Sequence, residues 1–185
     1  MQREYVLTGG PGSGKSSIIL ALEADGQAVV REAAEDVIKL MQARGIAEPW
    51  KQADFQNRIL DLQHLRELHM SRTEGTLFID RGTLDGLAYY NLQGVEPSGM
   101  MRREIENYEF AARGMYGMQK RYEKVFLIES LGSCKRSAVR RENLMEAKEL
   151  ERLQAMNYVK MGYEIIRIAP GTVDERVTKI LDSTK

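Results

Sequence analysis

One short stretch near the N-terminus, GGPGSGKSS at residues 9–17, restricts the fold more than any other part of the chain. It fits the pattern G-x-x-x-x-G-K-[ST], which is typical of a loop that wraps around phosphate groups. A strand-like run, 5–8, precedes it and a helix-compatible run, 17–22, follows it, which is the context such a loop needs. The alternative is an ordinary glycine-rich turn, but a turn has no use for a lysine and a serine at these two positions.

The residue types in this stretch predict a role for each part of it. Glycines let successive backbone N–H groups turn towards the phosphates, and the helix that follows adds its positive N-terminal end. Lys15 should reach the β and γ oxygens of a nucleotide, and the Ser16 hydroxyl should ligate Mg²⁺. The predicted nucleotide-binding residues are Gly9, Gly10, Pro11, Gly12, Ser13, Gly14, Lys15, Ser16 and Ser17.

Length and composition exclude several classes of protein. The 185 residues, 43% of them apolar, are enough for one buried core. Since 27 basic residues balance 27 acidic ones, we expect no attraction to nucleic acid or to an anionic membrane. Cys134 is the lone cysteine, which excludes an internal disulfide and suits a reducing compartment. With no signal peptide and no long apolar run, we expect a cytoplasmic protein.

Short apolar runs alternate with helical patterns along the chain. Apolar residues recur at helical spacing over 52–70, and Thr172 with Glu175 forms a capping box that begins a final helix. Such alternation predicts a three-layer α/β fold around a mostly parallel sheet, with ligands beyond the carboxyl ends of the strands. The predicted strands are 5–8, 27–31, 76–80, 125–129 and 165–169. We expect one domain over 1–185, with substrate-selecting helical insertions at about 33–75 and about 83–123 and a lid at about 130–143.

The run IDRGTLD at 79–85 places charged residues at the end of a predicted strand. Asp80 is where a carboxylate would approach the metal directly or through water. Arg81 can grip a transferring phosphoryl group or an acceptor phosphate with two nitrogens. Asp85 lies four residues further on and would orient Arg81. The alternative is an ordinary pair of opposite charges on the surface at the strand end.

Glu32 follows the second predicted strand on the same edge of the sheet. A carboxylate that faces the γ-phosphate there would accept a proton from an attacking hydroxyl, or hold that hydroxyl by a hydrogen bond. The alternative is that Glu32, like Glu35, is an ordinary acid of an early helical turn, stabilised by the helix dipole.

A basic segment follows the fourth predicted strand: Lys135, Arg136, Arg140 and Arg141 lie within seven residues. In a neutral chain this local positive charge is typical of a lid that closes over polyphosphate, and we take Arg140 and Arg141 as candidate catalytic residues. A solvated helix face is the alternative. His64 and His69 are five residues apart, which is not metal-binding spacing on a helix.

Together these residues resemble the P-loop kinase group, and more narrowly the AAA-type domain found in ribosylnicotinamide kinases. The stretches that carry the resemblance are GGPGSGKSS, Glu32-Ala33-Ala34, Phe55-Gln56, IDRGTLD with Ala88-Tyr89, Gly162-Tyr163-Glu164 and Val173-x-x-Arg176-Val177. The resemblance implies a five-stranded sheet of the nucleotide-kinase type, ATP in the phosphate loop, and a second substrate between the two insertions. The lid lacks the acidic-then-arginine pattern of those relatives, so Arg140 or Arg141 would take the role of that arginine.

The predicted function is Mg²⁺-dependent transfer of the ATP γ-phosphate to a nucleoside, a nucleotide or a ribosyl compound. Lys15, Glu32, Asp80 and Arg81 would be catalytic, and Ser16 and Asp80 would hold the metal. The chain has no Asn-Lys-x-Asp stretch of GTP-selective folds, which favours ATP. The alternative is an ATPase or GTPase switch that acts through a protein partner. The sequence does not decide the oligomeric state, so a homo-oligomer stays open.

Overall fold

A five-stranded parallel sheet forms the middle layer of the computed structural model, which describes residues 2–70, 74–132 and 142–185. Its strand order is β2-β3-β1-β4-β5. The strands are β1 (Arg3–Thr8), β2 (Ala28–Val30), β3 (Thr76–Asp80), β4 (Lys124–Ile128) and β5 (Ile165–Ile168). The α-helices are α1 (Lys15–Ala24), α2 (Ala33–Ala43), α3 (Phe55–Met70), α4 (Leu87–Gln93), α5 (Gly99–Ala112), α6 (Leu144–Lys160) and α7 (Val173–Asp182), with short 3-10 turns η1 (Pro49–Lys51), η2 (Thr83–Gly86) and η3 (Met115–Gly117).

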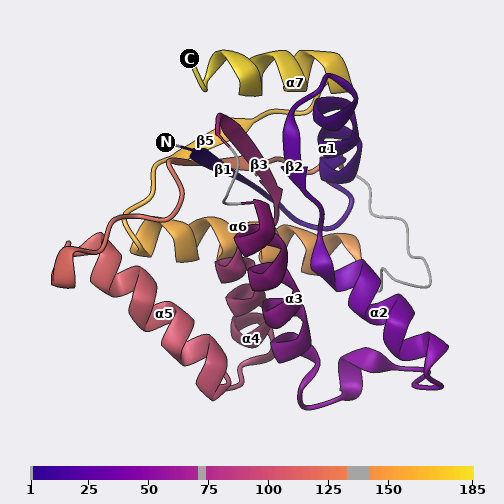
Figure 1. The fold of residues 1–185 in the computed structure, drawn as a ribbon. Coiled ribbons are helices and arrows are strands. Elements are labelled where there is room, and N and C mark those ends of the chain that lie inside the picture. Colours follow the sequence, from indigo (N-terminus) through magenta and orange to yellow (C-terminus); the bar gives the residue numbers. More distant parts are fainter. Residues whose placement is uncertain (1, 71–73, 133–141) are drawn as a thin grey trace.

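Helices cover both faces of the sheet (Figure 1). Helices α1 and α7 lie against one face, while α3, α4 and α6 lie on the other. The two cores follow from the period of two along a strand: Tyr5 and Leu7 point into the α1–α7 layer, and Val6 between them points into the opposite core. Because both faces are covered, the central strands carry continuous buried apolar runs, 5–7, 77–79 and 125–128, as in other buried parallel sheets.

The predicted α/β fold is confirmed, and all five predicted strands form and run parallel. Strand β2 is shorter than the predicted run 27–31 because it lies at the edge of the sheet and pairs only with β3. The predicted capping box at Thr172 and Glu175 begins α7. The described part of the first predicted insertion, 33–75, holds α2, η1 and α3. The second predicted insertion, 83–123, holds η2, α4, α5 and η3.

The topology brings the charged loops together. Strand β1 lies between β3 and β4, so the loops that leave the carboxyl ends of neighbouring strands meet above the centre of the sheet. In open parallel sheets, such a switch point is where ligands bind. Among the described residues, no helix is long and apolar enough to cross a membrane.

Candidate active site

The stretch 9–17, called the phosphate-type loop from here on, connects β1 to α1 at this switch point. Gly14, the residue before the first turn of α1, has φ +84°, a left-handed conformation that side chains rarely adopt. Gly10 has an ordinary φ but no room, because a Cβ there would come closer than 3.0 Å to the carbonyl oxygen of Ala147 in α6. The loop is therefore fixed between the sheet and α6.

This close approach predicts a stability effect. We expect Gly10→Ala to lower the free energy of unfolding by about 1–3 kcal/mol, because the Cβ forces the loop and α6 apart. Gly99→Ala is the matched control, since Gly99 has an ordinary φ and nothing within 4 Å of an added Cβ. Denaturant unfolding of both variants measures the difference; equal stabilities would show that the loop has room to move.

Lys15 is the first residue of α1 and is almost fully buried, with 4% of its side chain exposed. Its ammonium donates to Asp80 Oδ1 at the end of β3 and lies 3.7 Å from Glu32 Oε2. Burial raises the pKa of Asp80, and the Lys15 ammonium acts in the opposite direction. The structure thus joins three residues that are far apart in the sequence, and Glu32 points into the site rather than serving only as an early-helix acid.

Arg81 follows β3 and has a positive φ of 66°, which is rare for a residue with a side chain. Its backbone N–H donates to Leu7 O at 3.0 Å, which ties the turn to the central strand. Its Nε donates to Glu32 Oε1 at 2.8 Å. Its Nη1 is buried without a hydrogen-bond partner among the described residues, at 3.6 Å from Asp85 Oδ1. This guanidinium nitrogen therefore has an ion-pair partner but no hydrogen bond among the described residues.

Asp85 in η2 is buried and accepts several hydrogen bonds. Its donors are the Thr8 hydroxyl, the Tyr158 hydroxyl at 2.9 Å and the backbone N–H of Gly82 at 2.9 Å. Burial raises the pKa of Asp85, whereas the Arg81 guanidinium lowers it. With three donors and a nearby arginine, this carboxylate connects β1, η2 and α6 beneath Arg81.

A cavity of about 600 Å³ extends from the phosphate-type loop to the helices on one side of the sheet. Glu32 and Arg81 lie on its wall, together with the loop and a second region formed by residues of α2, α3, α4 and α5 and of the segments that connect them. This second region combines apolar and aromatic side chains with amides, namely Ile38, Trp50, Phe55, Ile59, Leu60, Tyr89, Tyr90, Val95 and Met101, with Gln52, Gln56, Gln63 and Gln93. Such a mixture is typical of small-molecule sites.

Several site features were not predicted individually from the sequence. The amides of the second region had no signal except Gln56, in the Phe55-Gln56 pattern. Arg176 of α7 is 3% exposed and donates to Ser13 O at 2.7 Å and to Glu129 O at 3.0 Å, so it supports the loop from behind. Its only sequence signal was the Val173-x-x-Arg176 pattern.

Two further sets of residues named from the sequence are the basic residues of the predicted lid and the two histidines. The basic residues of the predicted lid lie outside the described residues, and these are Lys135, Arg136, Arg140 and Arg141. Of the two histidines, His64 pairs with Glu104 at 3.2 Å and His69 is exposed. Within the described ranges, no group of three His, Cys, Asp or Glu side chains is placed to hold a metal ion.

Comparisons with known proteins agree with this fold. The family model of the AAA domain matches residues 4–176, and the protein belongs to that family. No curated protein matches the chain. The fold is that of a P-loop kinase-like domain, as several solved structures show at low sequence identity.

Solved structures of two proteins illustrate the likeness. Deoxyadenosine kinase from M. mycoides with bound dATP is 13% identical, with a TM-score of 0.62 and 98% of both chains covered. The same enzyme with dCMP and a flexible dCDP gives 14% identity and a TM-score of 0.61. NadR in complex with NAD and AMP-PNP is 14% identical, with a TM-score of 0.65. That match covers 99% of this chain but 48% of NadR, so the chain corresponds to about half of that protein.

Proposed function

We propose that the protein binds Mg·ATP and transfers the γ-phosphate to a hydroxyl of a small molecule. The observation that carries the proposal is the junction of Lys15, Glu32 and Arg81, which lies in one cavity between the phosphate-type loop and a second, amide-lined region. A protein that only binds nucleotide needs the loop but not the second region. The solved relatives that share the fold were determined with dATP or AMP-PNP bound, which supports a nucleotide ligand.

The nucleotide phosphates would lie against residues 9–17, whose backbone N–H groups and helix N-terminus favour anions. Ser16 and Asp80 would hold Mg²⁺, and both present oxygen atoms, the ligands that this ion prefers. Nucleotide-bound Mg²⁺ commonly takes only one or two protein ligands, which agrees with the small donor set here. When bound, Mg²⁺ neutralises charge on the phosphate oxygens.

The transfer step would use Glu32 and Arg81. The acceptor oxygen bonds to the γ-phosphorus while the bond from that phosphorus to the β,γ-bridging oxygen breaks, and ADP leaves with the electron pair. Glu32 takes the hydroxyl proton, and the Arg81 guanidinium stabilises the charge on the moving phosphoryl group. Positioning and charge neutralisation supply most of the acceleration in such reactions.

The charges of the second region favour an uncharged acceptor such as a nucleoside or another ribosyl compound. Glu35 and Glu142 are among the described residues that line the cavity, whereas Lys51 is the cation there apart from Lys15 and Arg81. Lys51 already pairs with Glu48 at 2.6 Å. A nucleotide acceptor would bring negative charge to a wall with few free cations. Amides and aromatic rings suit a planar ring that carries hydrogen-bonding groups.

The direct test is ADP release from the purified protein with Mg·ATP, alone and with a panel of nucleosides, nucleotides and ribosylated pyridines. Stimulation by one member of the panel supports the kinase and identifies its acceptor. ADP release at one rate whatever acceptor is added would contradict the kinase proposal and favour the partner-dependent switch.

Glu32→Gln tests the proposed base. We expect kcat for transfer to fall by about 10²–10⁴-fold, because the amide cannot accept the proton, while ATP affinity stays nearly constant. Glu106→Gln, on the exposed face of α5, is the control for loss of one carboxylate. The measurement is steady-state ADP release with the acceptor identified above; an unchanged kcat would remove Glu32 from the reaction.

A further inference from the structure

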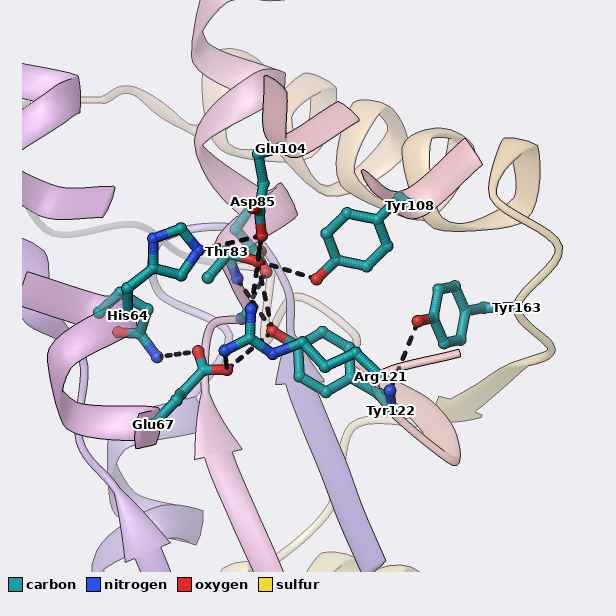
Figure 2. A network of polar contacts seen from close by, with 11 residues as sticks. His64, Glu67, Thr83, Asp85, Glu104, Tyr108, Arg121, Tyr122 and Tyr163 are labelled. Carbon is teal, nitrogen blue, oxygen red and sulfur yellow. Dashed lines mark hydrogen bonds and ion pairs between the residues drawn. The ribbon is translucent and has the colours of Figure 1, made fainter. Parts of the chain in front are cut away.

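A buried polar network lies behind the cavity, where α3, η2, α5 and the segment before β4 meet (Figure 2). Glu67 of α3 is 1% exposed and Glu104 of α5 is 6% exposed. Arg121 lies 2.9 Å from Glu67 Oε2 and 3.5 Å from Glu104 Oε1, so one guanidinium serves both carboxylates. Burial of such groups is costly unless hydrogen bonds compensate it. None of these three residues has a part in the proposed transfer.

Tyr122 connects this network to the turn that carries Arg81. Its hydroxyl accepts a hydrogen bond from the backbone N–H of Thr83 at 3.2 Å and donates one to Glu67 Oε2 at 3.1 Å. The Thr83 hydroxyl in turn donates to Glu104 Oε1 at 2.5 Å. Thr83 is therefore held through both its backbone and its side chain, two residues after Arg81.

Tyr122, together with Tyr158, also restricts the space around Gly82. A Cβ on Gly82 would lie 2.9 Å from Cε2 of the Tyr122 ring and still closer to the hydroxyl of Tyr158. The segment directly after Arg81 is thus enclosed on this side. Arg81 itself has the left-handed φ of 66°, a conformation that costs about 1–3 kcal/mol and persists only where the surroundings fix it.

The network also reaches the cavity wall. Gln63 lines the second region of the cavity and donates to Glu67 Oε1 at 2.8 Å. Glu67 is thus the common acceptor for Gln63, which faces the cavity, and for Tyr122, which holds the Arg81 turn. Hydrogen bonds therefore join the proposed acceptor wall to Thr83, which the backbone connects to the proposed catalytic Arg81 two residues earlier.

We propose that Tyr122 is a positioning residue for Arg81: its hydroxyl, anchored by Glu67, holds the Gly82–Thr83 segment so that the Arg81 guanidinium faces Glu32. The proposal rests on the proposed function, because it assigns Tyr122 to the transfer step through Arg81. Tyr122 does not touch the cavity itself, since it is absent from the lining residues.

Tyr122→Phe tests the proposal with little risk to folding, because Arg121 still pairs with Glu67 after the hydroxyl is removed. Tyr5→Phe is the matched control: Tyr5 is fully buried, and its hydroxyl has no hydrogen-bond partner among the described residues. We expect Tyr122→Phe to lower kcat by on the order of tenfold to a hundredfold with the KM for ATP unchanged, and Tyr5→Phe to leave both unchanged.

A double variant separates positioning from a general loss of stability. In an Arg81→Ala background, Tyr122→Phe should cause no further loss of kcat, because the group that it positions is gone. An equal factor in both backgrounds, or an unchanged kcat in Tyr122→Phe alone, would overturn the proposal.

A crystal structure of Tyr122→Phe gives an answer that does not depend on activity. The expected result is loss of the 2.8 Å contact between Arg81 Nε and Glu32 Oε1, which should persist in Tyr5→Phe. Retention of that contact overturns the positioning role. If no acceptor stimulates the wild-type protein, the kinase proposal fails by itself, and the crystal structure still decides whether Tyr122 holds the turn.

Discussion

Lys15→Met is expected to weaken ATP binding by about tenfold to a hundredfold and to reduce turnover to background. A charge-assisted contact of the lysine with phosphate oxygens is worth about 1.5–3 kcal/mol, which converts to that range of affinity. Methionine keeps most of the aliphatic volume and removes the charge. Isothermal titration of ATP, with and without Mg²⁺, measures the effect separately from any change at the metal.

The same variant should also be less stable, because it leaves Asp80 buried without its cation. Removal of one partner of a buried ion pair costs about 3–5 kcal/mol. Since burial raises the pKa of Asp80 above its unfolded value, the carboxyl group favours the folded state in acid, and this contribution is lost as the pH rises through the folded pKa. The loss of stability in Lys15→Met should therefore be larger at neutral pH than in acid.

Lys15→Met combined with Asp80→Asn distinguishes the two effects. The double variant removes both charges of the pair, so it should recover much of the lost stability. It should not recover ATP binding measured without Mg²⁺, since the phosphate contact is still missing. If the double variant binds ATP as tightly as the wild-type protein, the part of Lys15 is only to neutralise Asp80.

The sequence alone predicted the layers and the loops of this fold because both depend on local patterns. Buried parallel strands appear as short apolar runs, and the phosphate-type loop has fixed spacing between its glycines, Lys15 and Ser16. The meeting of Lys15, Glu32 and Arg81 followed from the rule that strand ends share one edge of the sheet. These three residues lie at the ends of different elements, and the structure brings them into one cavity.

The cavity wall and its support could not be predicted in this way. Gln63 and Glu67 lie on a helix whose apolar spacing is ordinary, and nothing local shows that Glu67 is buried. Tyr122 fills the core, and its hydroxyl also holds Thr83 across 39 positions of sequence. Such contacts depend on how helices cross the sheet, which residue periodicity does not encode.

Arg81→Ala is expected to lower the rate of transfer by on the order of a thousandfold and to leave ATP affinity nearly intact. The size follows from the role proposed for Arg81, because arginines that stabilise charge on a transferring phosphoryl group have effects of this order. Its Nη1 makes no hydrogen bond to the described residues, and its contact there is the 3.6 Å ion pair with Asp85 Oδ1. Steady-state ADP release with acceptor gives kcat, and titration gives the affinity for ATP.

Two further variants make the result specific to this guanidinium. Arg81→Lys keeps the charge but loses the planar fork, so its kcat should fall between those of the wild-type protein and Arg81→Ala. Arg152→Ala removes an exposed arginine that pairs with Glu149 on α6, and it should have no effect. If Arg81→Ala transfers phosphate at the wild-type rate, Arg81 only shapes the turn after β3. The junction of charges that supports the kinase proposal would then lose its main argument.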